Sequence, residues 1–188
     1  MLEKEHSEPL TEQVLADDAY WGGELHDEKR GRGSPNKTPF IAAVQLHEGR
    51  PQRAKFHRVD GFTKADVEKW ATENLDSPCE VITDGLACFN GVEDAGFAHT
   101  KIITGGGANS MKIQVFAWLN IILGNLKNSL RGTYHSMSQK HLPRYLAEFE
   151  YRFNRRFDLS ALPRQLVADS IHTQPIPCRI LKLAEAYW

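Results

Sequence analysis

Cysteine is scarce in this sequence, and its spacing argues against two common kinds of small domain. The 188 residues include only Cys79, Cys88 and Cys178, and no two of them form a CxxC pair. Zinc ribbons and disulfide frameworks need closely spaced or even-numbered cysteines, so neither is expected. The pattern fits a reducing, cytosolic setting.

Long apolar runs and a large net charge are missing as well. Every apolar run is short and interrupted, whereas a transmembrane helix needs about 20 apolar residues. The first residues, MLEKEHSEPLTEQ, are polar and acidic, so we expect neither a secretory signal nor a membrane partner. With 41% hydrophobic and 25% charged residues, the chain has the composition of a single soluble globular domain.

The formal net charge of −1 is unevenly distributed along the chain. Residues 127–164 carry eight Lys or Arg and three Asp or Glu, a net charge of +5, whereas residues 1–126 carry −6. A basic segment on an otherwise acidic protein is typical of a surface that binds a polyanion. A solvated helical face would give the same pattern, so charge alone leaves both interpretations open.

The pattern of apolar residues predicts an α/β domain with a mixed sheet and helices against its faces, in the order βββαβ(α)βαα. The strands are expected over residues 14–23, 39–46, 53–62, 78–85 and 98–104, with a turn-like loop over 47–52. The helices are expected over residues 63–75, 116–135 and 138–157, followed by one short helix in the tail. Trp21, Trp70 and Trp118 are expected in the core.

The helix predicted over residues 116–135 has a polar stripe. At 100° per residue, Asn120, Gly124, Lys127 and Arg131 fall within about 60° of one another, and the apolar residues fall on the opposite side. Gly124 would let another group approach the backbone closely. The stripe is either the solvent side of an ordinary amphipathic helix or a functional face.

Two predicted strands carry aspartates, which are uncommon in strands. Asp17 and Asp18 are adjacent, so they are expected to point to opposite faces of the sheet. Asp84 ends a strand at its carboxyl edge, where open sheets tend to bind ligands. Neighbouring carboxylates repel unless a cation lies between them, and Mg²⁺ prefers oxygen ligands. The alternatives are that Asp17 is solvated and that Asp84 only begins an Asp-Gly turn. Taken together, Asp17, Asp84, Asn120 and Lys127 are the kind of residues that a two-metal phosphoryl-transfer site requires.

Four segments carry a resemblance to a known family: DDAYWGGE, GRGSPNKTPFIAAVQ, VITDGLACFNGV and LKNSLRGTYHSMSQKHLPRYLAEFEYRFNRR. They are similar to the catalytic domain of insertion-sequence DDE transposases of the ISXO type. The resemblance implies an RNase H-like fold. Residues 1–13 would be an N-terminal extension, residues 14–158 the catalytic domain, and residues 159–188 a helical or irregular tail.

The resemblance also implies roles for single residues. Asp17, Asp84 and Asn120 would be catalytic and would hold two Mg²⁺ or Mn²⁺ ions, and Lys127 would be a catalytic residue that contacts a phosphate near the scissile bond. The residues implied to line the DNA path are Lys127, Arg131, Tyr134, His135, Lys140 and Arg144.

The activity implied by the resemblance is metal-dependent cleavage at the 3′ ends of an insertion sequence, followed by strand transfer. The partners would be transposon-end DNA, target DNA and further copies of the chain in a synaptic complex. The expected location is the cytoplasm, in association with the nucleoid.

The sequence departs from the family pattern in three places. Asn120 is neutral where many relatives have Glu, which predicts weaker metal binding. Ile122 and Leu123 replace an aromatic pair. Relatives usually carry an N-terminal zinc ribbon and helix-turn-helix, whereas the strand with Asp17 begins almost at Met1. The chain would then be truncated, or another polypeptide would recognise the transposon ends. The alternatives are a catalytically silent remnant that binds DNA or a partner, and a nuclease of the same fold.

Overall fold

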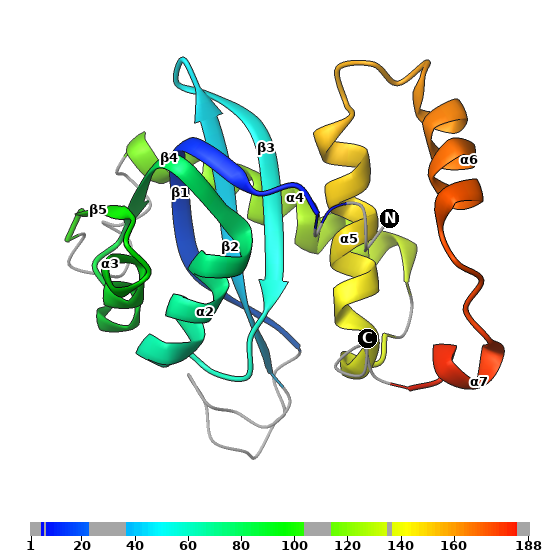
Figure 1. Cartoon of the computed structure of the whole chain (residues 1–188), viewed down its shortest axis with the longest axis horizontal. Helices are drawn as coiled ribbons and strands as arrows, with labels where there is room; N and C mark the ends of the chain where they lie inside the picture. The colour runs from blue at the N-terminus through cyan, green and yellow to red at the C-terminus, as the bar shows by residue number, and fades with distance from the viewer. Residues whose placement is uncertain (1–4, 6, 23–36, 104–113, 135–136, 184–188) are drawn as a thin grey trace.

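A five-stranded mixed sheet forms the centre of the protein, seen in the computed structural model of Figure 1. The structure describes residues 5, 7–22, 37–103, 114–134 and 137–183. The strands are β1 (Leu10–Trp21), β2 (Thr38–His47), β3 (Arg50–Arg58), β4 (Leu75–Thr83) and β5 (Ala98–Lys101). Their order is β3-β2-β1-β4-β5, in which β2 is antiparallel to β1 and β3, and β4 is parallel to β1 and β5.

Helices cover both faces of the sheet (Figure 1). One face packs against α2 (Lys64–Asn74), η1 (Ala87–Asn90) and α3 (Gly91–Asp94). The other face packs against α4 (Ala117–Thr133) and α5 (Leu142–Asn154), which follow the short turns η3 (Gln114–Phe116) and η4 (Gln139–His141). Farther from the sheet, beyond α5, lie α6 (Leu162–His172) and α7 (Cys178–Leu181). None of the described helices is long and apolar enough to cross a membrane.

Two hydrophobic cores result from the alternation of side chains along the strands. On β1, Leu15 and Ala19 belong to the core that contains α4 and α5, whereas Val14 and Ala16 belong to the core that contains α2 and α3. Because successive strand residues point to opposite faces, Asp17 lies on the α4 side of the sheet and Asp18 on the α2 side.

The first predicted helix has the expected start. Thr63 caps α2: its hydroxyl oxygen accepts the Asp66 backbone N–H at 3.1 Å and its hydroxyl donates to the Asp66 carboxylate at 2.6 Å. Such a cap satisfies backbone donors that have no partner within the helix. The helix buries Val67, Trp70 and Ala71 against the sheet.

The sheet confirms the predicted fold class and element order, but three local predictions are wrong. The loop expected over residues 47–52 is a two-residue turn at Glu48 and Gly49, both at positive φ, which matches the twist of paired strands and extends their pairing to His47 and Arg50. The tail contains two helices rather than one. Of the tryptophans expected in the core, Trp70 is buried but Trp118 is 40% exposed.

The open edge of β3 is closed by side chains from the end of α5. Asn154 accepts the Ala54 N–H at 2.8 Å and donates to the Ala54 carbonyl at 3.1 Å, as a neighbouring strand would. Glu150 accepts the N–H of Phe56, and Arg156 donates to two further carbonyls of β3. Covered edges do not recruit strands from other chains, so α5 completes the sheet.

Candidate active site

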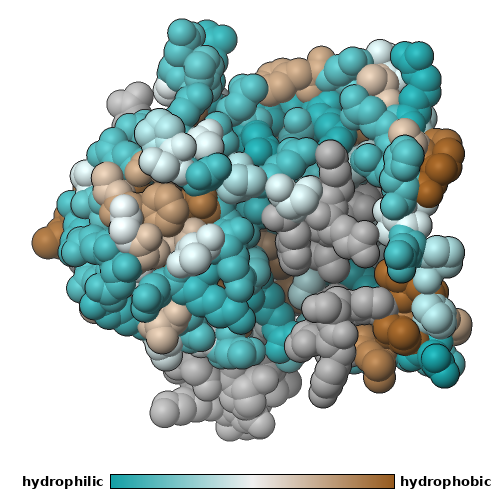
Figure 2. Space-filling view, viewed as in Figure 1, coloured by the Kyte–Doolittle hydropathy of each residue, from teal (hydrophilic) through white to brown (hydrophobic). Residues whose placement is uncertain are grey.

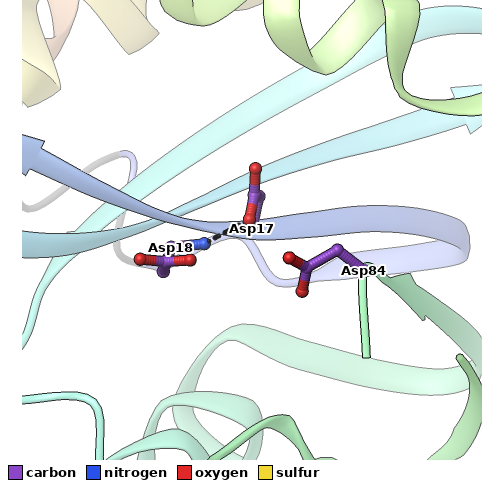
Figure 3. Close-up of side chains that lie close together, drawn as sticks. All are labelled: Asp17, Asp18 and Asp84. Carbon is purple, nitrogen blue, oxygen red and sulfur yellow. Dashed lines mark hydrogen bonds between the residues drawn. The ribbon is translucent and has the colours of Figure 1, made fainter. Parts of the chain in front are cut away.

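The parallel pairing of β1 with β4 brings two aspartates together. The pairing runs from Leu10 opposite Leu75 to Leu15 opposite Ile82. Asp17 and Asp84 each lie two residues beyond that last pair: Asp17 is within β1, where β1 still pairs with β2, and Asp84 directly follows β4. Carboxylate oxygens of Asp17, Asp18 and Asp84 all lie within 4.8 Å of one another (Figure 3), and all three side chains are half-buried.

Local hydrogen bonds hold two of these carboxylates. The Asp18 backbone N–H donates to Asp17 Oδ1 at 2.8 Å. The Leu86 N–H donates to Asp84 Oδ1 at 3.0 Å, so Asp84 also begins a turn, as one of the alternatives from the sequence held. Gly85 has φ 86° in this turn, a conformation that costs glycine little. Figure 3 shows the Asp84 carboxylate turned toward Asp17 and Asp18.

Asp18 takes part in the cluster although it starts from the opposite face to Asp17. Since β4 stops pairing with β1 after Leu15, no strand separates the two faces at this position. Both carboxylates therefore reach the same edge of β1. The sequence identified Asp18 only as a neighbour of Asp17, because the end of the β1–β4 pairing cannot be seen in a single sequence.

The donor set suits a hard divalent cation. Three carboxylates this close repel one another, and a divalent ion between them removes the repulsion. All donors are oxygens, which favours Mg²⁺ or Mn²⁺ over metals that prefer nitrogen or sulfur. The residues present therefore fit the metal ions expected from the sequence.

The predicted polar stripe lies on α4, where Leu119, Ile122 and Leu126 are buried on the opposite side. Asn120 is exposed, and its side chain has no hydrogen-bond partner among the described residues. Lys127 is half-buried and lines a cleft together with Asp18 and Arg131. The fold thus brings Asp17 and Asp84 together, places Lys127 in a cleft that Asp18 also lines, and leaves Asn120 exposed on the helix.

The cleft beside the carboxylates has a volume of about 570 Å³. The end of β1 forms one part of its wall, and α4 forms another. Its lining residues are Asp18, Ala19, Tyr20, Trp21, Gly22, Lys37, Lys127 and Arg131. Lys37 was not singled out from the sequence, and only its closeness to Gly22 in the folded sheet brings it here.

Most other cations of residues 127–164 hold the fold together. Arg155 pairs with Glu5 and lies over the Tyr151 ring, and Arg152 pairs with Glu148 at 2.7 Å. Lys140 and Arg144 donate to backbone carbonyls at the end of α7, at 2.7 and 3.0 Å. The net charge of the segment therefore overstates the charge available to a polyanion.

Tyr134 and His135, both predicted to line the DNA path, differ in what the structure describes of them. Tyr134 packs edge-on against Tyr145, with ring centroids 4.5 Å apart, and burial raises the pKa of its hydroxyl. His135 lies outside the described residues. DNA contacts by Tyr134, His135, Lys140 and Arg144 stay predictions.

A family model described as the ISXO2-like transposase domain matches residues 9–154. That range contains the whole sheet, the carboxylate cluster and α4. The chain belongs to the ISXO2-like transposase domain family. The resemblance seen in the sequence and the RNase H-like fold that it implied are confirmed. No curated protein sequence matches the chain.

Membership of this transposase family carries general chemical consequences. ISXO2-like transposases are DDE enzymes of the nuclease and polynucleotidyl transferase kind, so the family implies DNA as partner and divalent metal as cofactor. The acidic cluster of this ISXO2-like domain provides a place where such a metal fits. The helices α6 and α7 lie outside the matched range.

Proposed function

We propose that this domain cleaves phosphodiester bonds at the 3′ ends of an insertion sequence and joins those ends to target DNA. The observation that carries the proposal is that one carboxylate oxygen each of Asp17, Asp18 and Asp84 lie within 4.8 Å of one another, just beyond the point where β1 and β4 stop pairing. The family match supplies the reaction class, and the carboxylates supply a place for the metal that this class needs.

The metal ions would be held by Asp17 and Asp84, with Asp18 and Asn120 as the neighbouring oxygen donors. When bound, two Mg²⁺ or Mn²⁺ ions stabilise charge on the scissile phosphate and activate the attacking oxygen. The Asp17 and Asp84 carboxylates are oriented before metal binding by the backbone N–H groups of Asp18 and Leu86. Such preorientation lowers the cost of assembling the site.

The DNA would approach along α4 and the end of β1. Lys127 is half-buried in the cleft that Asp18 also lines, so it would place a positive charge near the scissile phosphate without leaving the cleft. Arg131 lies one turn farther along the same stripe and extends the positive surface away from the carboxylates. Further copies of the chain would assemble with the two transposon ends in the synaptic complex.

A metal-binding and cleavage experiment tests this function. Mn²⁺ binding is followed by electron paramagnetic resonance, and Mg²⁺-dependent nicking of a supercoiled plasmid reports activity. We expect Asp17→Asn and Asp84→Asn each to abolish measurable Mn²⁺ binding and to reduce cleavage by about 10³-fold, because each removes a charged ligand. Asp60→Asn is the matched control, since Asp60 is an exposed carboxylate outside the cluster.

The outcomes separate three functions. Cleavage followed by joining of a pre-cleaved end supports the transposase reaction. Hydrolysis of branched DNA without joining would assign the site to a nuclease. A wild-type chain that binds DNA but neither Mn²⁺ nor Mg²⁺ would be a silent remnant, and the proposal would be wrong.

A further inference from the structure

The cleft beside Asp18 receives positive charge from two separate parts of the chain. Lys37 immediately precedes β2, whereas Lys127 and Arg131 lie on α4. Among the described residues, no carboxylate forms a salt bridge with any of these three cations. They differ in this from Arg152 and Arg155, whose charges are paired within the fold. The cleft is therefore the place in the described chain where unpaired cations gather next to the carboxylates.

Trp21 gives the same cleft an aromatic wall. Its side chain packs partly against the core under α4 and also lines the cleft. The sequence predicted Trp21 as a core residue, and the fold places it half-buried at the end of β1. A ring that is anchored on one side and open on the other is a suitable surface for stacking of a nucleobase.

The size of the cleft limits what it can hold. A volume of about 570 Å³ lies within the range of sites that enclose one small molecule, roughly 300–1,000 Å³. It suits a single nucleotide and is too small for a base-paired duplex. Cations that bind phosphates beside an aromatic ring are the usual combination for unpaired nucleic acid.

We propose that this cleft is a subsite for one unpaired nucleotide of the DNA end, with Lys37 and Arg131 on its phosphates and Trp21 against its base. The inference rests on the proposed function, because Asp18 joins the cleft to the metal-binding cluster. It assigns Lys37 and Trp21 to DNA binding. It also gives a reason why Lys37 and the α4 cations, Lys127 and Arg131, meet at the end of β1. The nucleotide held there would be adjacent to the phosphate that Lys127 contacts.

Binding measured without divalent metal tests the subsite separately from catalysis. The probe is a fluorescein-labelled hairpin duplex with a three-nucleotide single-stranded 3′ end, prepared with normal bases or with abasic sites in that end. Fluorescence anisotropy in EDTA gives Kd for both probes at several salt concentrations. The variants are Lys37→Ala, Trp21→Leu and Trp21→Tyr, and Lys69→Ala is the control because Lys69 is an exposed cation on α2.

We expect wild type to bind the normal probe about 10-fold more tightly than the abasic probe, because stacking of a base is lost in the latter. The ratio should fall to about 1 in Trp21→Leu and persist in Trp21→Tyr. Lys37→Ala should weaken both probes about 5-fold and reduce the slope of log K against log salt by about 0.7, the loss of one single-strand phosphate contact. The ratio of two probes on one variant does not depend on how much of that variant is folded.

Other results would overturn the inference. Equal binding of the two probes by wild type, or an unchanged ratio in Trp21→Leu, would show that no base stacks on Trp21 in the cleft. A salt slope in Lys37→Ala equal to that of Lys69→Ala would show that Lys37 does not contact a phosphate. Failure of Asp17→Asn to affect cleavage would refute the proposed catalytic site instead, since binding in EDTA does not require it.

Discussion

At the scale of single residues, the third oxygen donor of the site is the point on which sequence and fold differ. The sequence placed a neutral Asn120 in that position, whereas the fold places the charged Asp18 beside Asp17 and Asp84. A carboxylate neutralises a divalent ion better than an amide does. We therefore expect Asp18 to supply the negative charge that Asn120 lacks.

We expect Asp18→Asn to weaken Mn²⁺ binding by about 10-fold and Asn120→Ala to weaken it by about 3-fold or less, because a lost charge costs more than a lost dipole. Isothermal titration calorimetry measures both affinities. Asn120→Asp provides the complementary variant, with tighter binding expected if the α4 side chain reaches the metal. A larger effect of Asn120→Ala than of Asp18→Asn would show that Asn120, and not Asp18, is the third metal ligand.

Glu150 shows a second residue-scale effect, which concerns stability. Burial raises the pKa of this carboxyl from 4.5 to about 8, and the Phe56 N–H that it accepts only partly opposes the shift. Its charged neighbours are Glu5, Lys55 and Arg53. The folded chain holds a proton that the unfolded chain releases above pH 4.5. The contribution of protonated Glu150 to the free energy of unfolding is therefore complete below about pH 4.5 and is lost as the pH rises towards about 8.

We expect Glu150→Gln to flatten this pH dependence, since glutamine stays neutral and still accepts the Phe56 N–H. Urea unfolding should give similar free energies for wild type and variant at pH 5. At pH 8 the variant should be more stable by about 3 kcal/mol. Glu148→Gln, on the exposed side of the same helix, is the control. Parallel pH profiles for wild type and Glu150→Gln would show that Glu150 is ionised in the fold.

At the scale of elements, α5 has a structural role that its sequence did not reveal. The segment that ends in EFEYRFNRR belongs to the basic stretch of residues 127–164, for which the sequence left open a polyanion-binding surface or a solvated face. In the fold, Glu150, Asn154 and Arg156 instead hydrogen-bond to the backbone of the edge strand β3. These hydrogen bonds require polar side chains whose spacing along the helix matches the spacing of the peptide groups along the strand.

Asn154→Ala should therefore lower the free energy of unfolding by about 1–3 kcal/mol, because it leaves the Ala54 N–H and carbonyl without their partner. Chemical denaturation measures the loss. Arg152→Ala, which removes an exposed ion pair from the same helix, should cost at most about 1 kcal/mol. Equal losses in the two variants would mean that water replaces Asn154 at the edge of β3.

The same elements show which features a single sequence can predict. Local signals were sufficient for the capped start of α2, the apolar side of α4 and the strand that ends at Asp84, since each depends on neighbouring residues. The arrival of Lys37 and Trp21 at the cleft depends on how β1 pairs with β2 and on where β4 ends. Those are long-range pairings, and the sequence carries no local pattern for them.

At the scale of the whole molecule, the site and the tail lie in different parts of the structure. The carboxylates lie just beyond the point where β1 and β4 stop pairing, and α6 and α7 lie on the far side of α5 (Figure 1). Neither tail helix contains a buried residue. Apolar residues such as Val167, Ile171 and Leu183 are exposed, and Figure 2 shows hydrophobic surface gathered on this flank.

Hydrogen bonds between described residues join the tail to the rest of the domain. Tyr151 donates to Asp169 at 2.8 Å, and Lys140 and Arg144 donate to carbonyls at the end of α7. Each such bond contributes about 0.5–1.5 kcal/mol. The tail therefore adds little to the stability of a domain whose two cores, with the side chains packed against them, contain only residues from 10 to 153.

Removal of residues 159–188 tests the predicted boundary of the catalytic domain. We expect residues 1–158 to unfold cooperatively, with Tm lowered by about 3–18 °C, since three bonds of about 0.5–1.5 kcal/mol are lost and about 1 kcal/mol lowers Tm by about 2–4 °C in a domain of this size. Mn²⁺ binding should be unchanged, because the carboxylates lie on the sheet, whereas α6 and α7 lie on the far side of α5. The full chain with Asp169→Asn is the control, as it weakens one tail bond without exposing new surface. Loss of cooperative unfolding in the truncated chain would place the tail inside the domain and move its boundary beyond residue 158.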